Sequence, residues 1–209
     1  MNNLLIIGAR GYGREVYNWV MDCVSSGLEI KVKGFLDDNP NALSGFANYP
    51  PVISSVEDYS PQHDDVFLCA LGDVNYRKTY ADIIASKKGH FISIVHPTAS
   101  VSQNVRIGEG CIIGRFCAIS CDVSIGDFVS ISAHSVLGHD VQIGNYCHIG
   151  ALSNLSGGVI LEDRVTLHPK VDIIPHKKVG VGAVVGTGSV VLRNVKSGTT
   201  VFGVPAKSL

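Results

Sequence analysis

Every sixth position from Val95 to Val191 is aliphatic, without an insertion or a slip. Four residues after each lies a second register of small or apolar side chains, in which only Lys177 departs from the pattern. Neither the 3.6-residue period of a helix nor the two-residue period of a strand produces a strict period of six. A hexapeptide repeat is the signature of a parallel β-helix, in which each repeat covers one flat side of a prism. The pattern predicts coils of about 18 residues, five to six of them, and argues against a β-sandwich with irregularly spaced turns.

Each repeat assigns its side chains to the inside or the outside of the prism. The aliphatic residue should point to the axis and the small residue should fill the next corner, while glycine eases the bend between sides. Cys111, Cys117 and Cys147 fall in the inward small register, where a thiol is a small hydrophobe. The apolar pair Val201-Phe202, followed by Gly and Pro, is expected to leave the prism and cover its open end.

The chain before the prism alternates between apolar strands and amphipathic helices. Strands are expected at 4–7, 31–35 and 65–71, and helices at about 14–25 and 75–86. Such alternation implies a parallel sheet. The predicted fold is therefore an α/β, Rossmann-like N-terminal domain (1–90) followed by an all-β parallel β-helix domain with a C-terminal extension (91–209).

A glycine-rich turn, Gly8-Ala9-Arg10-Gly11-Tyr12-Gly13, joins the first expected strand to the first helix. Glycines there let a backbone approach a phosphate, and the helix N-terminus favours negative charge. Asp37 and Asp38 end the second strand about 25 residues later, where such folds place an acceptor for ribose or base. The G-x-x-G-x-G spacing departs from the usual G-x-G-x-x-G. A tight turn beside solvated carboxylates is therefore an equally open interpretation.

Charge and cysteine content narrow the class of function. The formal net charge is −1, which gives no electrostatic case for nucleic acid or an anionic membrane. The apolar run at 4–7 is too short to span a bilayer, so no membrane insertion is expected. Six cysteines show no CxxC or metal-type spacing, which indicates a reducing, cytoplasmic setting and no metal site.

Four stretches together carry a family resemblance: GARGYGREV near the N-terminus, FLDD at 35–38, the hexapeptide array and FGVPAK near the C-terminus. In this order they resemble the bacterial sugar acetyltransferases of the sialic acid O-acetyltransferase type, a group that includes the nucleotide-aminosugar N-acetyltransferases. The resemblance implies a homotrimer of left-handed β-helices. It also implies acetyl-CoA in the cleft between neighbouring prisms and a nucleotide sugar held by the N-terminal domain.

The same resemblance implies roles for individual residues. His139 is expected to be the general base, because a base for this reaction should titrate near neutrality and histidine is the side chain that ordinarily does. Asp140 should support the protonated form of His139. His148 is expected to contact acetyl-CoA or to assist the oxyanion together with the following glycine amide, and the C-terminal glycines should supply backbone to coenzyme A. The expected acetyl-CoA contacts are His148, Gly150 and Gly186. The expected nucleotide-sugar contacts are Gly11, Tyr12, Gly13, Asp37, Asp38 and Asp73.

The sequence leaves three alternatives to the expected function open. The acceptor is expected to be the amino group of a nucleotide-linked sugar, for instance a UDP-linked one in bacterial surface glycan biosynthesis, with O-acetylation of sialic acid or another glycan precursor as the alternative. A non-catalytic nucleotide-sugar-binding protein is the second alternative. The third is a zinc β-helix enzyme of the carbonic anhydrase type that uses His134 and His139. Its third ligand position is Thr98 here, and a catalytic zinc needs three protein ligands.

Overall fold

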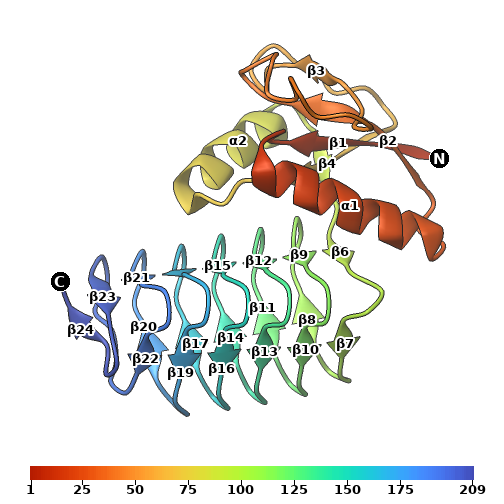
Figure 1. The fold of residues 1–209 in the computed structure, drawn as a ribbon. Coiled ribbons are helices and arrows are strands. Elements are labelled where there is room, and N and C mark those ends of the chain that lie inside the picture. Colours follow the sequence, from red (N-terminus) through yellow and green to blue (C-terminus); the bar gives the residue numbers. More distant parts are fainter.

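The structure, a computed structural model, describes residues 1–209 and has two parts (Figure 1). The N-terminal part is a five-stranded parallel sheet in the order β3-β2-β1-β4-β5 with two helices. Its elements are β1 (Asn2–Ile7), α1 (Gly11–Ser25), β2 (Ile30–Leu36), β3 (Val52–Ser54), β4 (Asp65–Cys69), α2 (Val74–Ser86) and β5 (His90–Phe91). The edge strand β3 was not predicted, because three residues are too few to show an alternating pattern.

The two helices cover opposite faces of this sheet. In β1, Leu4 and Ile6 are buried with α1, whereas Leu5 and Ile7 are buried with α2. Successive strand side chains point to opposite faces, so a strand buried on both sides is apolar at every position. This explains why the central strands appear in the sequence as continuous apolar runs.

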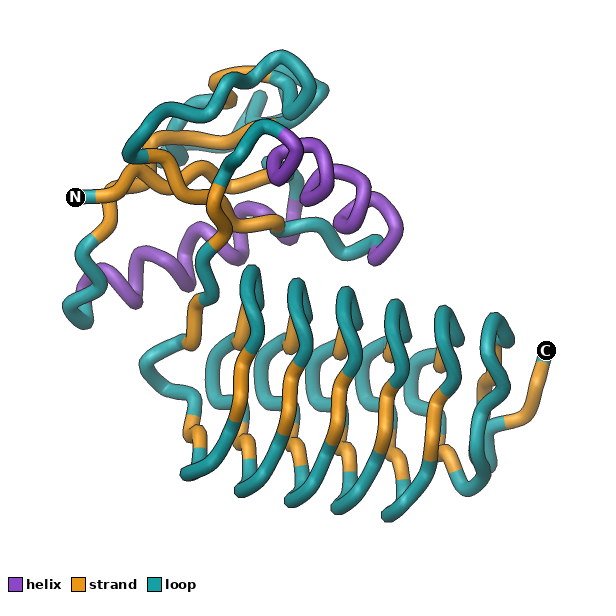
Figure 2. The backbone as a smooth tube through the Cα atoms, turned by 180° about the vertical axis from the view of Figure 1, so that it is seen from behind, coloured by secondary structure: helices purple, strands orange, loops and turns teal.

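The C-terminal part is a parallel β-solenoid with three walls, each a sheet of short strands that have two residues, except for the three-residue β23 (Figure 2). Residues 18 apart pair in register, as Ile131 does with Ile149 and Ile149 with Leu167. These features agree with the predicted β-helix of 18-residue coils and are consistent with the left-handed form.

Wall 1 contains β6 (Ile94–Val95), β9 (Ile112–Ile113), β12 (Ser130–Ile131), β15 (His148–Ile149), β18 (Thr166–Leu167), β21 (Val184–Val185), β23 (Thr200–Phe202) and β24 (Lys207–Ser208). Wall 2 contains β7 (Ser100–Val101), β10 (Ala118–Ile119), β13 (Val136–Leu137), β16 (Asn154–Leu155), β19 (Asp172–Ile173) and β22 (Val190–Val191). Wall 3 contains β8 (Arg106–Ile107), β11 (Ser124–Ile125), β14 (Gln142–Ile143), β17 (Ile160–Leu161) and β20 (Lys178–Val179).

The inward registers form one continuous core along the solenoid axis, with 26 buried residues. Cys111, Cys117 and Cys147 belong to this core, as predicted. At the N-terminal end Val95 and Val101 are more than a third exposed, because no earlier coil covers them. Burial of the aliphatic register against the coils above and below is what stabilises the column.

Glycine was expected to ease the bend between the walls of the solenoid, and the structure corrects this expectation. The residues with positive φ are mostly not glycine, for example Asp122, Phe128 and Asp140. The glycines that follow the aliphatic positions serve a different purpose. A Cβ on Gly138 would lie 2.7 Å from the backbone nitrogen of Gly157 in the next coil. Glycine is required at such positions because the backbones of successive coils approach each other closely.

The C-terminal segment also differs from expectation. Val201 and Phe202 do not leave the prism: β23 pairs in parallel with β21 and adds one more strand to wall 1. Only after Phe202 does the chain turn back, and β24 pairs antiparallel with β23. The hexapeptide spacing is lost in this region, yet the backbone groups at the edge of β21 still form hydrogen bonds with a further strand.

The N-terminal domain lies over wall 1 of the solenoid, beside its early coils (Figures 1 and 2). The inner face of α1 packs on Ile94 and Ile112. On the other side, Phe91 and Phe128 make an edge contact with ring centroids 4.8 Å apart. The two domains therefore share buried apolar surface, which holds the sheet of the first domain against wall 1 of the second.

Candidate active site

A pocket of about 640 Å³ opens at the carboxyl edge of the N-terminal sheet. Ligands of open parallel sheets bind at this edge, where the strand-to-helix loops meet. Five of the six residues expected from the sequence to contact the nucleotide sugar line it, and Gly11 does not. The lining includes Tyr12, Gly13, Asp37, Asp38 and Asp73, together with residues that the sequence did not single out: Arg10, Asn39, Tyr76 and Tyr80.

The carboxylates of the pocket also hold its walls in place. The Oδ2 of Asp37 accepts from the Ala9 amide at 2.8 Å and its Oδ1 from the Asn39 amide at 2.9 Å. Asp38 accepts a hydrogen bond from the Tyr80 hydroxyl, and this bond is the main reason that the pKa of Tyr80 is raised to about 12. The acidic pair therefore ties the glycine turn and α2 to the end of β2.

The two helices present different N-termini to this pocket. At α2, Asp73 is the N-cap, and its Oδ1 accepts from the amides of Asn75 and Tyr76 at 2.8 and 3.0 Å. At α1, the N-cap Arg10 makes no side-chain cap, and the first turn contains no acidic residue. The amides of the first turn of α1 and the Arg10 guanidinium, the one cation in the lining, are suited to a phosphate group.

Tyr12 joins the pocket to wall 1 of the solenoid. Its hydroxyl is hydrogen-bonded to the Ser130 hydroxyl, and its ring meets His148 edge-on at 6.0 Å. Burial raises the pKa of Tyr12, which keeps the phenol protonated. His148 therefore lies directly beneath the N-terminal domain, next to a residue that lines the pocket.

Arg77, which was not predicted as a functional residue, lies on the other side of His148. Its side chain is 1% exposed and reaches from α2 into the solenoid. Its Nη2 lies 3.4 Å from the Nδ1 of His148. A signal was present in the sequence, because Arg77 shares the buried face of α2 with Val74, Ala81 and Ile84. An arginine at such a position requires buried partners.

His148 is held in its neutral form by these surroundings. Burial, the Arg77 guanidinium and His168 together lower the pKa of His148 to about 4. Gly150 and Gly186 lie on the same wall, directly after β15 and β21. The Gly150 amide donates to Leu167 O at 2.8 Å and the Gly186 amide to Val201 O at 2.8 Å, so neither N–H is free for a ligand.

His139 and Asp140 lie at the corner between walls 2 and 3, opposite wall 1. The Nδ1 of His139 is 2.7 Å from the Oδ2 of Asp140, and the two side chains are 62% and 66% exposed. The imidazole lies over Gly157 in the next coil, where a Cβ would come within 2.5 Å of its Nε2. Glycine at this position leaves the outer nitrogen of His139 accessible. The structure thus separates His139 from His148 and the pocket within one chain.

Two further histidines of the solenoid have local packing partners. His134 stacks on Phe116 with ring centroids 4.9 Å apart, and His176 lies over Gly158. Within the chain, no three His, Cys, Asp or Glu side chains gather closely enough to hold a metal ion. Neither helix combines the length and the hydrophobicity that crossing a bilayer requires.

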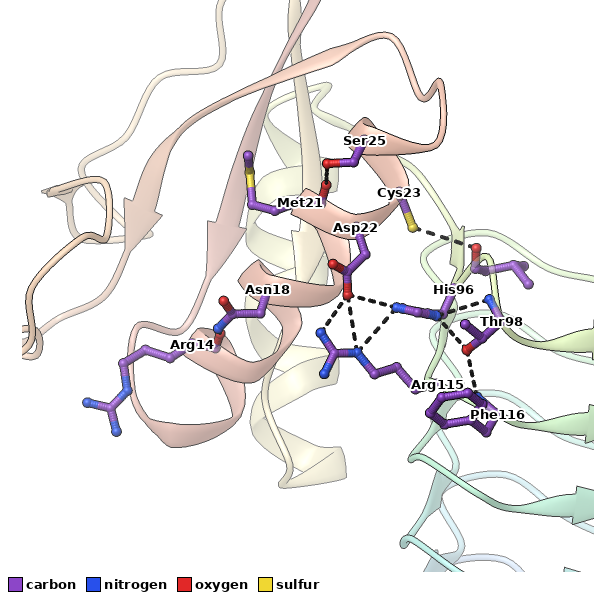
Figure 3. A network of polar contacts seen from close by, with 11 residues as sticks. Arg14, Asn18, Met21, Asp22, Cys23, Ser25, His96, Thr98, Arg115 and Phe116 are labelled. Atoms are coloured by element: carbon purple, nitrogen blue, oxygen red, sulfur yellow. Dashed lines mark hydrogen bonds and ion pairs between the residues drawn. The ribbon is translucent and has the colours of Figure 1, made fainter.

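A polar network fastens α1 to the first coils (Figure 3). The Oδ2 of Asp22 accepts from His96 Nε2 at 3.0 Å and from Arg115 Nη2 at 2.5 Å. His96 is itself buried and contacts the Thr98 hydroxyl at 2.8 Å. The hydrogen bond from His96, followed by that from Arg115, lowers the pKa of Asp22.

We expect Asp22→Asn to lower the free energy of unfolding at pH 7 and to lower it less at pH 3. A carboxylate whose pKa is lowered by folding stabilises the protein above its unfolded pKa of about 3.9, and this contribution is lost as the pH falls through the folded value. Because the Asp22 side chain is 44% exposed, solvent screening limits the effect to about 1 kcal/mol. Urea unfolding at the two pH values measures it, and an equal loss at both would contradict the assignment.

Comparison with known protein families agrees with this architecture. Residues 3–84 match the PglD N-terminal domain, and residues 122–157 match the bacterial transferase hexapeptide repeat. The chain therefore contains a PglD-type N-terminal domain followed by bacterial transferase hexapeptide repeats, which confirms the resemblance seen in the sequence.

More particularly, it is close to the nucleotide-aminosugar N-acetyltransferases. PerB from Caulobacter crescentus, solved with CoA and GDP-perosamine, is 29% identical with a TM-score of 0.89, over 100% of this chain and 98% of that one. The acetyltransferase domain of PglB from Neisseria gonorrhoeae FA1090, solved with acetyl coenzyme A, is 26% identical with a TM-score of 0.88, over 100% of both chains. UDP-N-acetylbacillosamine N-acetyltransferase of Bacillus subtilis (strain 168) is 29% identical over 117 residues, 54% of this chain and 51% of that protein. The match thus spans about half the length of this curated relative.

Proposed function

We propose that this protein transfers the acetyl group of acetyl-CoA to the amino group of a nucleotide-linked amino sugar, in bacterial surface glycan biosynthesis. The observation that carries the proposal is the match of the whole chain, with both domains in one arrangement, to a structure that holds CoA and GDP-perosamine. We place the reaction in the cytoplasm, since all six cysteines are free and five are buried.

In this proposal residues 1–90 hold the nucleotide sugar. A pocket of about 640 Å³ is within the usual range for a ligand of this size. The diphosphate would lie at the N-terminus of α1, beside Gly11, Gly13 and Arg10. Asp37, Asp38 and Asp73 would accept hydrogen bonds from the nucleoside, and Tyr12 would direct the sugar towards wall 1.

Residues 91–209 would hold acetyl-CoA along wall 1. His148, Gly150 and Gly186 follow one another on this wall from the N-terminal domain towards the last coils. Because the Gly150 and Gly186 amides already bond to the next coil, we assign these glycines to close approach of the coenzyme chain and not to hydrogen bonding. His148 would contact the thioester end.

The proposed base requires a second copy of the chain. His139 and Asp140 are mostly exposed and lie at the corner opposite the wall that carries the pocket and His148. A base for acyl transfer must lie within hydrogen-bond reach of the attacking amine, in a site that excludes water. We therefore propose a homotrimer, in which the corner of one prism meets wall 1 of its neighbour.

The chemistry follows from these positions. Asp140 accepts a hydrogen bond from the Nδ1–H of His139, which leaves a lone pair on Nε2 for a proton of the attacking amine. The amine nitrogen forms a bond to the thioester carbonyl carbon, the resulting oxyanion collapses, and the carbon–sulfur bond breaks. The thiolate of CoA takes up the proton, so that the products are an N-acetyl sugar and free CoA. Holding both substrates together removes the need for a covalent enzyme intermediate.

The proposal is tested by mixing the protein with acetyl-CoA and a panel of UDP-, GDP- and dTDP-linked 4-amino sugars. Release of CoA thiol with formation of an alkali-stable amide is the expected result. A product that is an alkali-labile ester, formed on sialic acid or on a sugar hydroxyl, would instead establish an O-acetyltransferase. Thermal stabilisation by nucleotide sugars with no CoA release from any acceptor would indicate a non-catalytic binding protein.

A further inference from the structure

We propose that Arg77 is a positioning residue of the acetyl-transfer site: it fixes His148 as the tautomer that carries its proton on Nε2, and it connects this histidine to the wall of the sugar pocket. Its purpose in catalysis rests on the proposed function above. The geometry that supports it belongs to the single chain.

All five N–H groups of the Arg77 guanidinium have an acceptor. Nε donates to Leu71 O at 2.9 Å and Nη2 donates to the same oxygen at 2.6 Å. Nη1 donates to Phe128 O at 2.9 Å and to Cys147 O at 3.1 Å. The remaining Nη2 hydrogen is the one that faces His148 Nδ1 at 3.4 Å. A buried arginine with neutral acceptors on every hydrogen, and no carboxylate partner, is held in one orientation.

A guanidinium has donors and no lone pair, so the imidazole nitrogen that faces it must accept. Nδ1 of His148 therefore bears the lone pair, and the single proton of the neutral ring is on Nε2. The chain offers Nε2 no partner, which leaves this N–H for a ligand on wall 1. Such a donor can stabilise the oxygen of a thioester as negative charge develops on it.

The ionisable groups around His148 favour the neutral form of its imidazole. Arg77 approaches from α2, Tyr12 from the first turn of α1 and His168 from the end of β18. None of these is a carboxylate that would stabilise an imidazolium. Burial and the Arg77 cation also lower the pKa of His148 to about 4, so the neutral ring persists at physiological pH.

The neighbours of the two histidines of the proposed site therefore give their Nε2 atoms opposite roles, one as acceptor and the other as donor. His139 faces a carboxylate through Nδ1, so that its Nε2 is free to accept a proton. His148 faces a cation through Nδ1, so that its Nε2 donates. Neighbours that separate two titratable groups in this way assign one as base and the other as hydrogen-bond donor.

Arg77 also couples the two substrate sites. Leu71 lines the sugar pocket, and its carbonyl oxygen accepts two of the five guanidinium hydrogens. A shift of the loop after β4 would therefore move the guanidinium and, with it, the imidazole of His148. This places the control of His148 in the domain that holds the sugar.

The test compares Arg77→Met with Arg77→Lys in the full-length protein, and uses Arg115→Met as the matched control. Arg115 also joins the N-terminal domain to the solenoid, through Asp22, and makes no contact with His148. Nitrogen NMR of the imidazoles, without substrates, identifies the tautomer and the pKa. We expect Nε2–H and a pKa well below 6 in the wild type and in Arg115→Met. In Arg77→Met we expect mixed tautomers and a pKa that rises from the wild-type value but stays below the ordinary value of about 6.5, because burial, the largest cause of the shift, remains.

Kinetics supply the second readout. Arg77→Met should lower kcat for CoA release roughly ten- to a hundredfold with little change in KM for the nucleotide sugar, and Arg77→Lys, which keeps the cation, should recover part of the loss. Wild-type His148 protonated on Nδ1, or an unchanged His148 tautomer in Arg77→Met, would overturn the inference. If Arg77→Met does not fold, the wild-type tautomer and titration still decide it. Since the NMR readout needs no substrate, a wild type that has the Nε2 tautomer but releases no CoA would contradict the proposed function alone.

Discussion

His139→Ala is expected to slow CoA release from acetyl-CoA and a nucleotide amino sugar by roughly 10²–10⁴-fold, the usual contribution of a general base. The substitution removes the nitrogen that would take the amine proton, while the exposed corner that carries it contributes little to the core. Thermal unfolding and nucleotide-sugar binding should stay as in the wild type. The measurement is the initial rate of thiol release with both substrates saturating.

The chain provides a matched control in His63. This histidine is also followed by an aspartate, with His63 Nδ1 and Asp64 Oδ1 2.7 Å apart, but it is exposed on the N-terminal domain. His63→Ala should retain full activity, because an adjacent carboxylate alone does not make a base. Gly157→Ala is the complementary variant: its methyl group would displace the His139 ring and should cost up to about 10²-fold in kcat with the imidazole still present. Wild-type rates in His139→Ala would refute the assignment of the base.

Gly13→Ala is expected to destabilise the protein by about 3 kcal/mol or more and to abolish nucleotide-sugar binding. A Cβ on Gly13 would overlap the carbonyl oxygen of Gly8, and backbone at this point cannot move without separating α1 from β1. The pocket is lined by the same turn, so its shape would be lost together with the packing. Urea unfolding and calorimetric titration with a nucleotide sugar measure the two effects.

Gly11→Ala, two residues earlier, is the control for stability. A Cβ on Gly11 meets no atom within 4 Å, and its φ lies outside the left-handed region. Alanine at the start of α1 should therefore leave the free energy of unfolding unchanged or raise it by up to about 1 kcal/mol. If both alanine variants were equally destabilised, the close approach of Gly13 to Gly8 would not be the cause.

The pocket was predictable from the sequence because its residues come from few, local signals. A glycine turn after an apolar strand and an acidic pair after the next strand pointed to this edge, the family resemblance implied Gly13, Asp37 and Asp38 as contacts, and all three line the pocket. Parallel strands bring their carboxyl ends to one edge, which explains why residues distant in the chain meet there. The same reasoning could not find Tyr80, because its contact with Asp38 depends on how α2 is oriented over the sheet.

The catalytic candidates show the limit of sequence motifs. The pairing of His139 with Asp140 is local, and the structure contains it as a 2.7 Å contact. The position of the pair on the corner opposite wall 1 follows from the count of coils and walls, which a family motif does not express. The role of His148 was expected, whereas the residue that determines its tautomer was not, because Arg77 is 71 residues away in the chain.

By itself, the sequence determined the repeat architecture: a period of six residues can bury its aliphatic register only in a three-walled column of 18-residue coils. It also determined the parallel sheet before the column, through continuous apolar strands alternating with helices. Only the tertiary structure decided which chemistry each histidine can perform. Protonation and tautomer depend on the groups within a few ångströms, and docking of the N-terminal domain on wall 1 places a buried guanidinium beside His148, while His139 stays with its carboxylate at the far corner.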